Sequence, residues 1–419
     1  MGFNPFKEKG VAIEKQIKPW SQLNTKPYDP ESVHPYTRTR GILMNGIEVE
    51  AALFYHNWHR HTDNMDLRRQ LAMVRRVEQQ EQKMVNWVIP ASETTIEVTI
   101  GYEQLAVDLT AAMAKKEPDP YVKAALDYAL IEDFDHVYRY ANLMLQNNPK
   151  KAEAIVKDLT EIMPGRPTVL EHQHPFDGVR SFVDRKKADP LTLMHIMTII
   201  AAEQQTMNFY MNVGNRESDM NGRGLYQEIG MIEEQHVSHY GSLLDPRSSW
   251  FEMAALHEYN ECYMYYSCMI SEPDERIKGV WQQLLDNEIA HLHMIKELAI
   301  KHENKDIEEM FPGEVPSPLI LESSKDYVRQ IIETQFHYSA DRSEMVPMKN
   351  SESLPRFKEY QNMVNGGEYN PSQEAVMMAV KNTGMDYRLQ TEGEYPLEIL
   401  KDRKNVPSRK DLMNYSMSR

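Results

Sequence analysis

The chain has 419 residues, of which 41% are hydrophobic and 26% are charged, a composition typical of a globular protein with two or three domains. Its formal net charge of −16 at pH 7 argues against nucleic acid or an anionic membrane as a partner, because both attract basic surfaces. The two cysteines, Cys262 and Cys268, exclude a disulfide framework and a four-cysteine iron site, and they indicate a reducing compartment.

An N-terminal arm, residues 1–40, is rich in Pro, Lys and Tyr and has no clear periodicity. It lacks the apolar segment of a signal peptide, and no apolar run in the chain reaches the length of a membrane span, so we expect a cytoplasmic protein. Helical patterns separated by breakers then predict helices near 46–62, 66–89, 93–115, 120–147 and 150–163. Residues 94–100 alternate like a strand but lead into a helical pattern, which favours a helix start.

A turn-rich linker, residues 164–189, separates this set from four more predicted helices near 190–214, 219–243, 247–271 and 274–303. Residues 312–419 form a C-terminal extension with short predicted helices near 323–337, 351–364 and 371–384, which we expect to wrap the bundle or a second subunit, as in a homodimer formed through the terminal arms. The sequence therefore predicts an all-α protein with two tandem four-helix bundles, residues 41–163 and 190–311.

The two sets of long helices superimpose at one constant offset of 155 residues, without a gap. Acidic and histidine positions on all four helices agree at this offset: Glu48 with Glu203, Glu78 with Glu233, Glu103 with Glu258, Asp133 with Glu288, and His136 with His291. This self-similarity predicts a duplicated four-helix domain. One position differs, because Glu81 stands where the second half has His236.

The second half carries a pattern that suits a dinuclear metal site. Two of its helices have Glu-x-x-His, whose side chains share one helix face, and two contribute single acids. So many buried acids would be costly without cations, and mixed oxygen and imidazole ligands suit iron or manganese. Glu261, one turn after Glu258, is a second or alternative ligand, and Ala106 stands at the matching position of the first half. The predicted ligands are Glu203, Glu233, His236, Glu258, Glu261, Glu288 and His291.

The first half holds a second candidate metal site, with more carboxylates than the other. Two interpretations stay open: a working centre, because Glu binds hard cations in place of His, or a degenerate site kept for packing and polar contacts. Three other histidines are candidates for a role near a metal: His172 and His174 in a linker that could fold over a metal centre, and His195, two helical turns before Glu203. Structural roles are commoner for such histidines. The residues of this second site are Glu48, Glu78, Glu81, Glu103, Asp133 and His136.

The second-half acids and histidines resemble the ferritin-like superfamily of di-iron carboxylate proteins. The segment from Glu258 to Tyr265 is similar to the third helix of its rubrerythrin branch, where a second Glu one turn after the first also ligates. The resemblance implies a di-iron or manganese–iron centre that reacts with dioxygen or peroxide. The chain differs from proteins of that branch because it lacks their four-cysteine rubredoxin iron site. The expected electron donor is therefore external and unidentified.

On this interpretation the protein is an oxidoreductase with two iron ions, or manganese and iron, in the second bundle. Glu258 and Glu288 are expected to bridge the metals, Glu203 and Glu233 to bind terminally, and each imidazole to bind one metal. Two alternatives remain: a protein for iron oxidation with storage or delivery, and a non-catalytic helical scaffold with vestigial metal sites.

Overall fold

The computed structural model describes residues 2–341, 343–351, 355–366, 370–384, 395–397 and 400. Helix predominates in these residues, as the sequence predicts for an all-α protein. The two described strands, β1 (Tyr338–Asp341) and β2 (Glu344–Pro347), pair as a short antiparallel hairpin. A search of the described helices for one long and apolar enough to cross a membrane finds none.

Eight long helices form the body of the protein: α1 (Pro35–Arg60), α2 (Met65–Asn86), α3 (Thr95–Ala114), α4 (Pro120–Asn147), α7 (Pro190–Val213), α8 (Met220–Gly241), α9 (Trp250–Ser271) and α10 (Glu275–Glu303). The shorter α-helices are α5 (Glu153–Val156), α6 (Thr168–Glu171), α11 (Lys325–Gln335), α12 (Met348–Ser351), α13 (Pro355–Val364) and α14 (Pro371–Thr383). The 3-10 helices are η1 (Pro5–Lys7), η2 (Ile13–Lys15), η3 (Trp20–Gln22), η4 (Gly214–Arg216) and η5 (Ile307–Met310).

Two helices differ from their predicted bounds. Helix α1 begins inside the predicted N-terminal arm, because the His34 ring accepts a hydrogen bond from the Tyr36 amide and Pro35 occupies the first turn, where its missing N–H costs nothing. Helix α5 is much shorter than the predicted helix 150–163. It ends at Val156, and Lys157 then turns the chain with a φ of 53°.

The capping residues at the starts of the eight long helices recur at the same 155-residue offset as the acids and histidines. Each helix is capped by a side chain that accepts a hydrogen bond from the first turn, and these caps satisfy otherwise unpaired amides. Thr94 and Ser249 both form full capping boxes, so residues 94–100 start a helix, as predicted. The four pairs of caps are His34 with Asp189, Asn64 with Asp219, Thr94 with Ser249, and Asp119 with Asp274.

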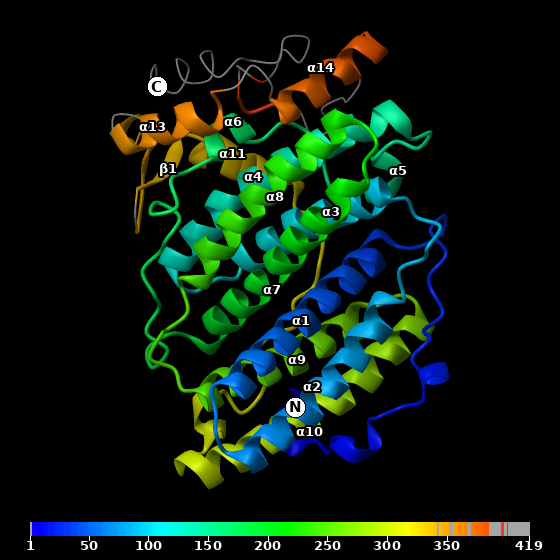
Figure 1. The fold of residues 1–419 in the computed structure, drawn as a ribbon, viewed down its shortest axis with the longest axis vertical. Helices are drawn as coiled ribbons and strands as arrows, with labels where there is room; N and C mark the ends of the chain where they lie inside the picture. The colour runs from blue at the N-terminus through cyan, green and yellow to red at the C-terminus, as the bar shows by residue number, and fades with distance from the viewer. Residues whose placement is uncertain are drawn as a thin grey trace.

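The long helices gather in two groups that mix the halves of the chain (Figure 1). Helices α1, α2, α9 and α10 form what we call the lower helix group, and α3, α4, α7 and α8 form the upper helix group. This differs from the predicted tandem order, in which residues 41–163 and 190–311 each make their own bundle. Each antiparallel hairpin stays intact, but the chain crosses between groups after α2 and again after α8.

Helices α1 and α7 cross at the junction of the two groups. A Cβ atom added to Gly46 would lie 2.8 Å from the carbonyl oxygen of Ala201, so only glycine permits this approach. Gly46 and Ala201 are themselves 155 residues apart. The crossing therefore lies at the pseudo-twofold axis that relates the two halves.

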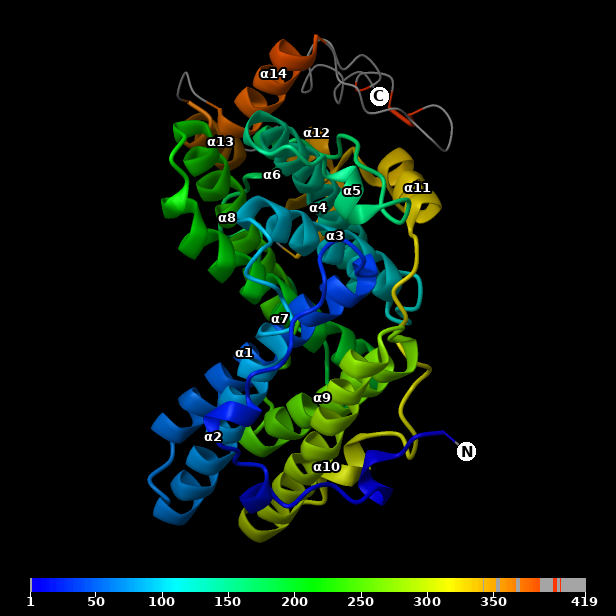
Figure 2. The ribbon, with the colours of Figure 1, turned by 90° about the vertical axis from the view of Figure 1, so that its right-hand side faces the viewer.

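The terminal segments cover opposite ends of the molecule (Figure 2). The N-terminal arm contacts the lower helix group, with η1 and η2 against α10. In the C-terminal extension, α14 packs against α4 and α8, and α11 packs against α4. The Ser372 amide donates a hydrogen bond to the Glu228 carboxylate at 2.9 Å. Helices α11 and α14 thus cover the upper helix group, whereas the segment before them runs along α9 of the lower group, where Tyr263 donates to the carbonyl oxygen of Ser317 at 3.0 Å.

Candidate metal centres

Each helix group encloses one buried cluster of acids and histidines. The seven residues predicted as one second-half site do not come together, because α7 and α8 lie in one group and α9 and α10 in the other. The upper cluster consists of Glu103, Asp133, His136, Glu203, Glu233 and His236. The lower cluster consists of Glu48, Glu78, Glu81, Glu258, Glu261, Glu288 and His291. All residues predicted for the two sites are therefore buried in one cluster or the other. Each cluster, however, combines residues from both predicted sites.

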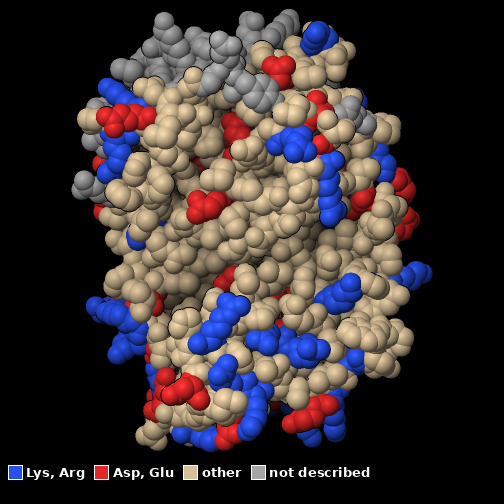
Figure 3. All heavy atoms as spheres, in the orientation of Figure 1, with Lys and Arg blue, Asp and Glu red and all other residues tan. Residues whose placement is uncertain are grey.

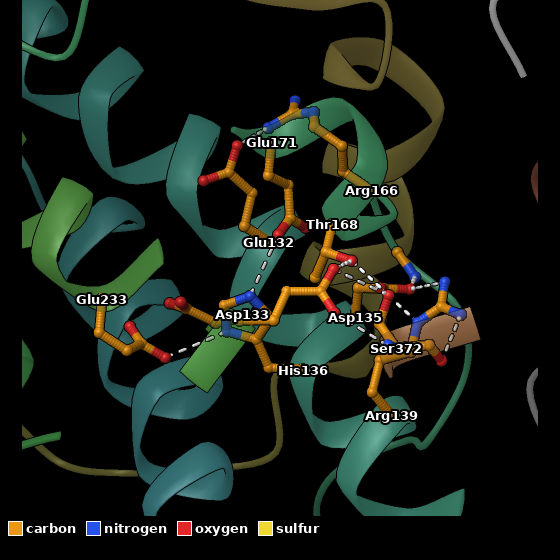
Figure 4. Close-up of polar contacts among 12 residues, drawn as sticks. Glu132, Asp133, Asp135, His136, Arg139, Arg166, Thr168, Glu171, Glu233 and Ser372 are labelled. Atoms are coloured by element: carbon orange, nitrogen blue, oxygen red, sulfur yellow. Dashed lines mark hydrogen bonds and ion pairs between the residues drawn. The ribbon is translucent and has the colours of Figure 1, made fainter. Parts of the chain in front are cut away.

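The upper cluster contains two overlapping sets of ligand atoms, each within 4.8 Å of one another. Glu233 belongs to both sets. Its Oε1 lies 3.2 Å from Nδ1 of His136, and its Oε2 lies 3.2 Å from Nδ1 of His236 (Figure 4 shows the first contact). One carboxylate thus faces both imidazoles, the geometry of a bridge between two ions. The two sets are Glu103, His136 and Glu233, and Asp133, Glu203, Glu233 and His236.

Carboxylates outside the upper cluster orient its two imidazoles. His136 donates from Nε2 to Glu171 at 3.2 Å, and His236 donates from Nε2 to Glu132 at 2.7 Å. The fully buried Arg166 holds Glu132 at 2.9 Å (Figure 4). With Nε2 directed to a carboxylate, Nδ1 of each ring faces the cluster, and in the neutral ring it offers a lone pair to an ion there.

The linker supplies two of these outer residues, which the sequence analysis did not identify. Glu171 and Arg166 both lie in segment 164–189. His172 and His174, the linker residues singled out for metal chemistry, lie outside both clusters; His172 instead approaches Glu228 at 3.9 Å. For the third outer residue, Glu132, the sequence carries one signal: it lies four residues before His136 on the same helix. That signal is weak, because acids at such a spacing are common on helices.

The lower cluster is centred on one imidazole. Nδ1 of His291 lies 2.9 Å from Glu288, 3.1 Å from Glu78 and 3.6 Å from Glu258. Here too two sets of ligand atoms overlap, and they share Glu78 and Glu288. The sets are Glu78, Glu81, Glu288 and His291, and Glu78, Glu258, Glu261 and Glu288. The remaining member, Glu48, lies near Glu81 and Glu78; burial, and then these two carboxylates, raise its pKa well above the usual value.

An amide from the N-terminal arm orients the lower imidazole. Nε2 of His291 donates to Oε1 of Gln16 at 2.7 Å. Gln16 is 2% exposed and donates in turn to the carbonyl oxygens of Val11 and Asn287. Asn287 also donates to Glu81 at 2.6 Å. The arm, which showed no periodicity in sequence, therefore completes the lower cluster.

Three tyrosines donate hydrogen bonds to carboxylates of the clusters. Tyr55 of α1 bonds Glu258 of α9, and Tyr210 of α7 bonds Glu103 of α3. These two contacts are equivalent under the 155-residue repeat, and each joins the two halves of the chain. In the lower cluster, Tyr265 also bonds Glu48. The tyrosines fix carboxylates that would otherwise rotate.

Many inward-facing atoms of the clusters form no hydrogen bond with the described residues, and their nearest polar neighbours are other members of the same cluster. They include Nδ1 of His136 and His236 and both oxygens of five carboxylates: Glu78, Asp133, Glu203, Glu233 and Glu261. Buried polar atoms are normally paired, and leaving one unpaired costs roughly 1–3 kcal/mol. Bound cations would satisfy these atoms together.

Burial also disfavours the charged form of these acids. It raises the pKa of Glu258 to about 8 and that of Glu81 to about 7, with a further increase from Glu78 in each case. The pKa of His291 is raised well above its usual value, because Glu78, Glu81 and Glu258 outweigh the opposing effect of burial. Without cations, protons must offset the charge of these carboxylates.

The two clusters differ in charge. The upper cluster has four carboxylates and two imidazoles, whereas the lower cluster has six carboxylates and one imidazole. Fully ionised, they carry −4 and −6, which two divalent or two trivalent cations respectively would neutralise. Hairpin α1–α2 packs with α9–α10 and not with α3–α4, an arrangement we call the exchange of hairpins. It places both Glu81 and Glu261 in the lower cluster, where the upper cluster has His236 and Ala106 at the matching positions. The carboxylate-rich set is thus one helix group drawn from both halves, and not the first half of the chain as predicted.

The remaining histidine of interest, His195, belongs to neither cluster; its Nδ1 lies 2.7 Å from the Glu117 carboxylate.

Comparisons of the chain with models of protein families, with curated proteins and with solved structures found no match. The two buried clusters are therefore the features of the molecule that bear on its function.

Proposed function

We propose that the protein is a ferritin-like dinuclear metal oxidoreductase with one centre in each helix group, and that it activates dioxygen or reduces peroxide. The observation that carries the proposal is the set of buried, inward-facing ligand atoms without hydrogen-bond partners. Carboxylates mixed with imidazoles suit iron or manganese, and burial of these acids is costly unless cations accompany them.

The overlapping sets of ligand atoms suggest which residue would hold which ion. In the upper centre, Glu233 would bridge, with Glu103 and His136 on one ion and the other three residues on the second. In the lower centre, Glu78 and Glu288 would bridge. This revises the expected roles, since Glu258 belongs to one lower set only and Glu233 belongs to both upper sets. Bound iron would supply one-electron redox chemistry and a position for an oxygen ligand.

The chain's own residues would tune these centres. Glu132 and Glu171 would make the upper imidazoles more basic by accepting their Nε2 protons, whereas the neutral Gln16 would do so less for His291. Tyr55 and Tyr210 would hold one carboxylate of each centre. Because Cys262 and Cys268 cannot build a four-cysteine iron site, reducing equivalents would come from an external donor.

Anaerobic loading of the metal-free protein with Fe²⁺ tests the proposal. We expect up to two irons per centre, proton release as the acids with raised pKa ionise, and oxidation of the iron by dioxygen or peroxide over repeated cycles. Fewer than one iron per chain would overturn the proposal and favour a scaffold, and uptake far beyond two per centre would favour storage.

Single-centre variants sharpen this test. Glu233→Ala should remove iron from the upper centre, and Glu78→Ala should remove it from the lower. Glu234→Ala is the matched control, because Glu234 is the exposed neighbour of Glu233. Full iron content in both ligand variants would contradict the assignment.

A further inference from the structure

The outer face of α2 forms a cavity with the N-terminal arm. The cavity has a volume of about 830 Å³ and is lined by Trp20 and Leu23 of the arm and by Arg75, Arg76, Lys83 and Trp87 in and after α2. Ala72, Gln79 and Gln80 also line the cavity, so its lining recurs every three or four residues along the helix (72, 76, 79 or 80, 83 and 87) and shares one face. The opposite face of α2 carries Glu78 and Glu81, which puts the cavity one helix thickness from the lower cluster.

The cavity is basic in a protein that is acidic as a whole. No acidic residue is present among the described residues that line it. In the described part of the chain, none of Arg75, Arg76 and Lys83 forms an ion pair with a carboxylate. The space-filling view shows basic side chains gathered over the lower helix group (Figure 3). Guanidinium groups in this arrangement suit a carboxylate or phosphate, which they can bind in a bidentate manner.

One of the arginines is held in place by a histidine. Nη1 of Arg75 lies 3.1 Å from Nδ1 of His56, so the guanidinium donates to a neutral imidazole. That contact fixes the side chain without using its charge. The remaining guanidinium hydrogens are available to a ligand in the cavity.

The rest of the wall is aromatic. Trp20 is 82% exposed and Trp87 is 37% exposed, and Leu23 lies buried beside them. Nζ of Lys83 lies 3.8 Å from the centre of the Trp87 ring, a cation–π contact that leaves the ammonium at the cavity edge. Exposed tryptophans beside a basic cavity offer flat apolar surface on which a ring can stack.

We propose that this cavity binds an organic anion that carries a planar aromatic ring. The carboxylate or phosphate of the ligand contacts Arg75 and Arg76, and the ring lies against Trp20 and Trp87. This site is distinct from the two clusters and does not depend on bound metal.

Binding is tested on the metal-free full-length protein with two probes, flavin mononucleotide and 4-hydroxybenzoate, by tryptophan fluorescence and equilibrium dialysis. At least one probe should bind, and added salt should weaken it. Riboflavin, which lacks the phosphate, should bind at least tenfold more weakly than flavin mononucleotide if that is the probe bound. Inorganic phosphate, which lacks the ring, should compete only weakly. Binding of neither probe overturns the proposal.

Variants locate the site. The double variant Arg75→Gln, Arg76→Gln should weaken binding at least tenfold, and Trp20→Leu, at a position that is 82% exposed, should weaken it several-fold. Arg68→Gln, on the same helix outside the cavity, is the control and should bind like the natural protein. Unchanged binding by both cavity variants, each with an unchanged melting temperature, places the ligand elsewhere and overturns the assignment.

Discussion

At the scale of single residues, the partner of each imidazole distinguishes the two clusters. Gln16 reaches across from the N-terminal arm to His291, whereas Glu132 and Glu171 serve the upper histidines. Loss of such an outer partner typically costs about 10- to 100-fold in metal affinity. The amide of Gln16 is therefore a positioning group for the lower cluster alone.

We expect Gln16→Leu to weaken iron binding at the lower cluster about 10- to 100-fold and to leave the upper cluster unchanged. Anaerobic iron titration of this variant in the Glu233→Ala background isolates the lower centre. Gln22→Leu, an exposed glutamine of the same arm, is the control. Equal loss at both centres would mean that the arm acts on the whole fold instead.

The repeat also offers an exchange of ligands between the clusters. Glu81→His places in the lower cluster the residue that the upper cluster has at His236. It removes one negative charge within contact distance, an interaction of about 4 kcal/mol at an effective dielectric constant of about 20, so the midpoint potential of the lower centre should rise by on the order of 100 mV. Redox titration of the iron-loaded protein measures the shift. A fall in potential would contradict the charge argument.

At the scale of elements, the crossing of α1 and α7 joins the two helix groups. Gly46→Ala puts a Cβ atom against the Ala201 carbonyl oxygen, and backbone cannot move aside as a side chain can. We expect a loss of about 1–3 kcal/mol in the free energy of unfolding, measured by chemical denaturation. Gly279→Ala, in an exposed turn of α10 where an added Cβ atom meets nothing within 4 Å, should instead stabilise by about 0.5–1 kcal/mol. Equal effects at the two glycines would rule out a close-approach role for Gly46.

At the scale of the whole molecule, each cluster is built from both halves of the chain. Residues 1–163 contain three members of the upper cluster, Glu103, Asp133 and His136, and three of the lower cluster, Glu48, Glu78 and Glu81. The exchange of hairpins separates the two sets within that half.

Expressed separately, residues 1–163 and 164–419 should each fail to bind iron tightly as monomers, and co-expression should restore it. Light scattering with iron analysis tests this. Dimers of either half are scored separately, since two copies could complete each other's sites. A monomeric half that binds two irons would support sequential bundles.

The sequence by itself determined the all-α class, most of the long helices and which acids and histidines recur on them. Helix periodicity, capping residues and the spacing of acids are local properties, so the long helices and the all-α fold were predictable. The 155-residue repeat likewise singled out residues that the structure buries, such as Glu203 and His291.

Only the tertiary structure decided which of these residues share a site. Because the repeat makes the hairpin α3–α4 equivalent to α9–α10, either could complete the acid face of α1–α2, and a pattern within one half cannot choose between them. The crossing at Gly46 and the paths of the connecting segments make that choice. Gln16 and Glu171 were equally out of reach, since they meet His291 and His136 through contacts that are remote in sequence and leave no periodic signal.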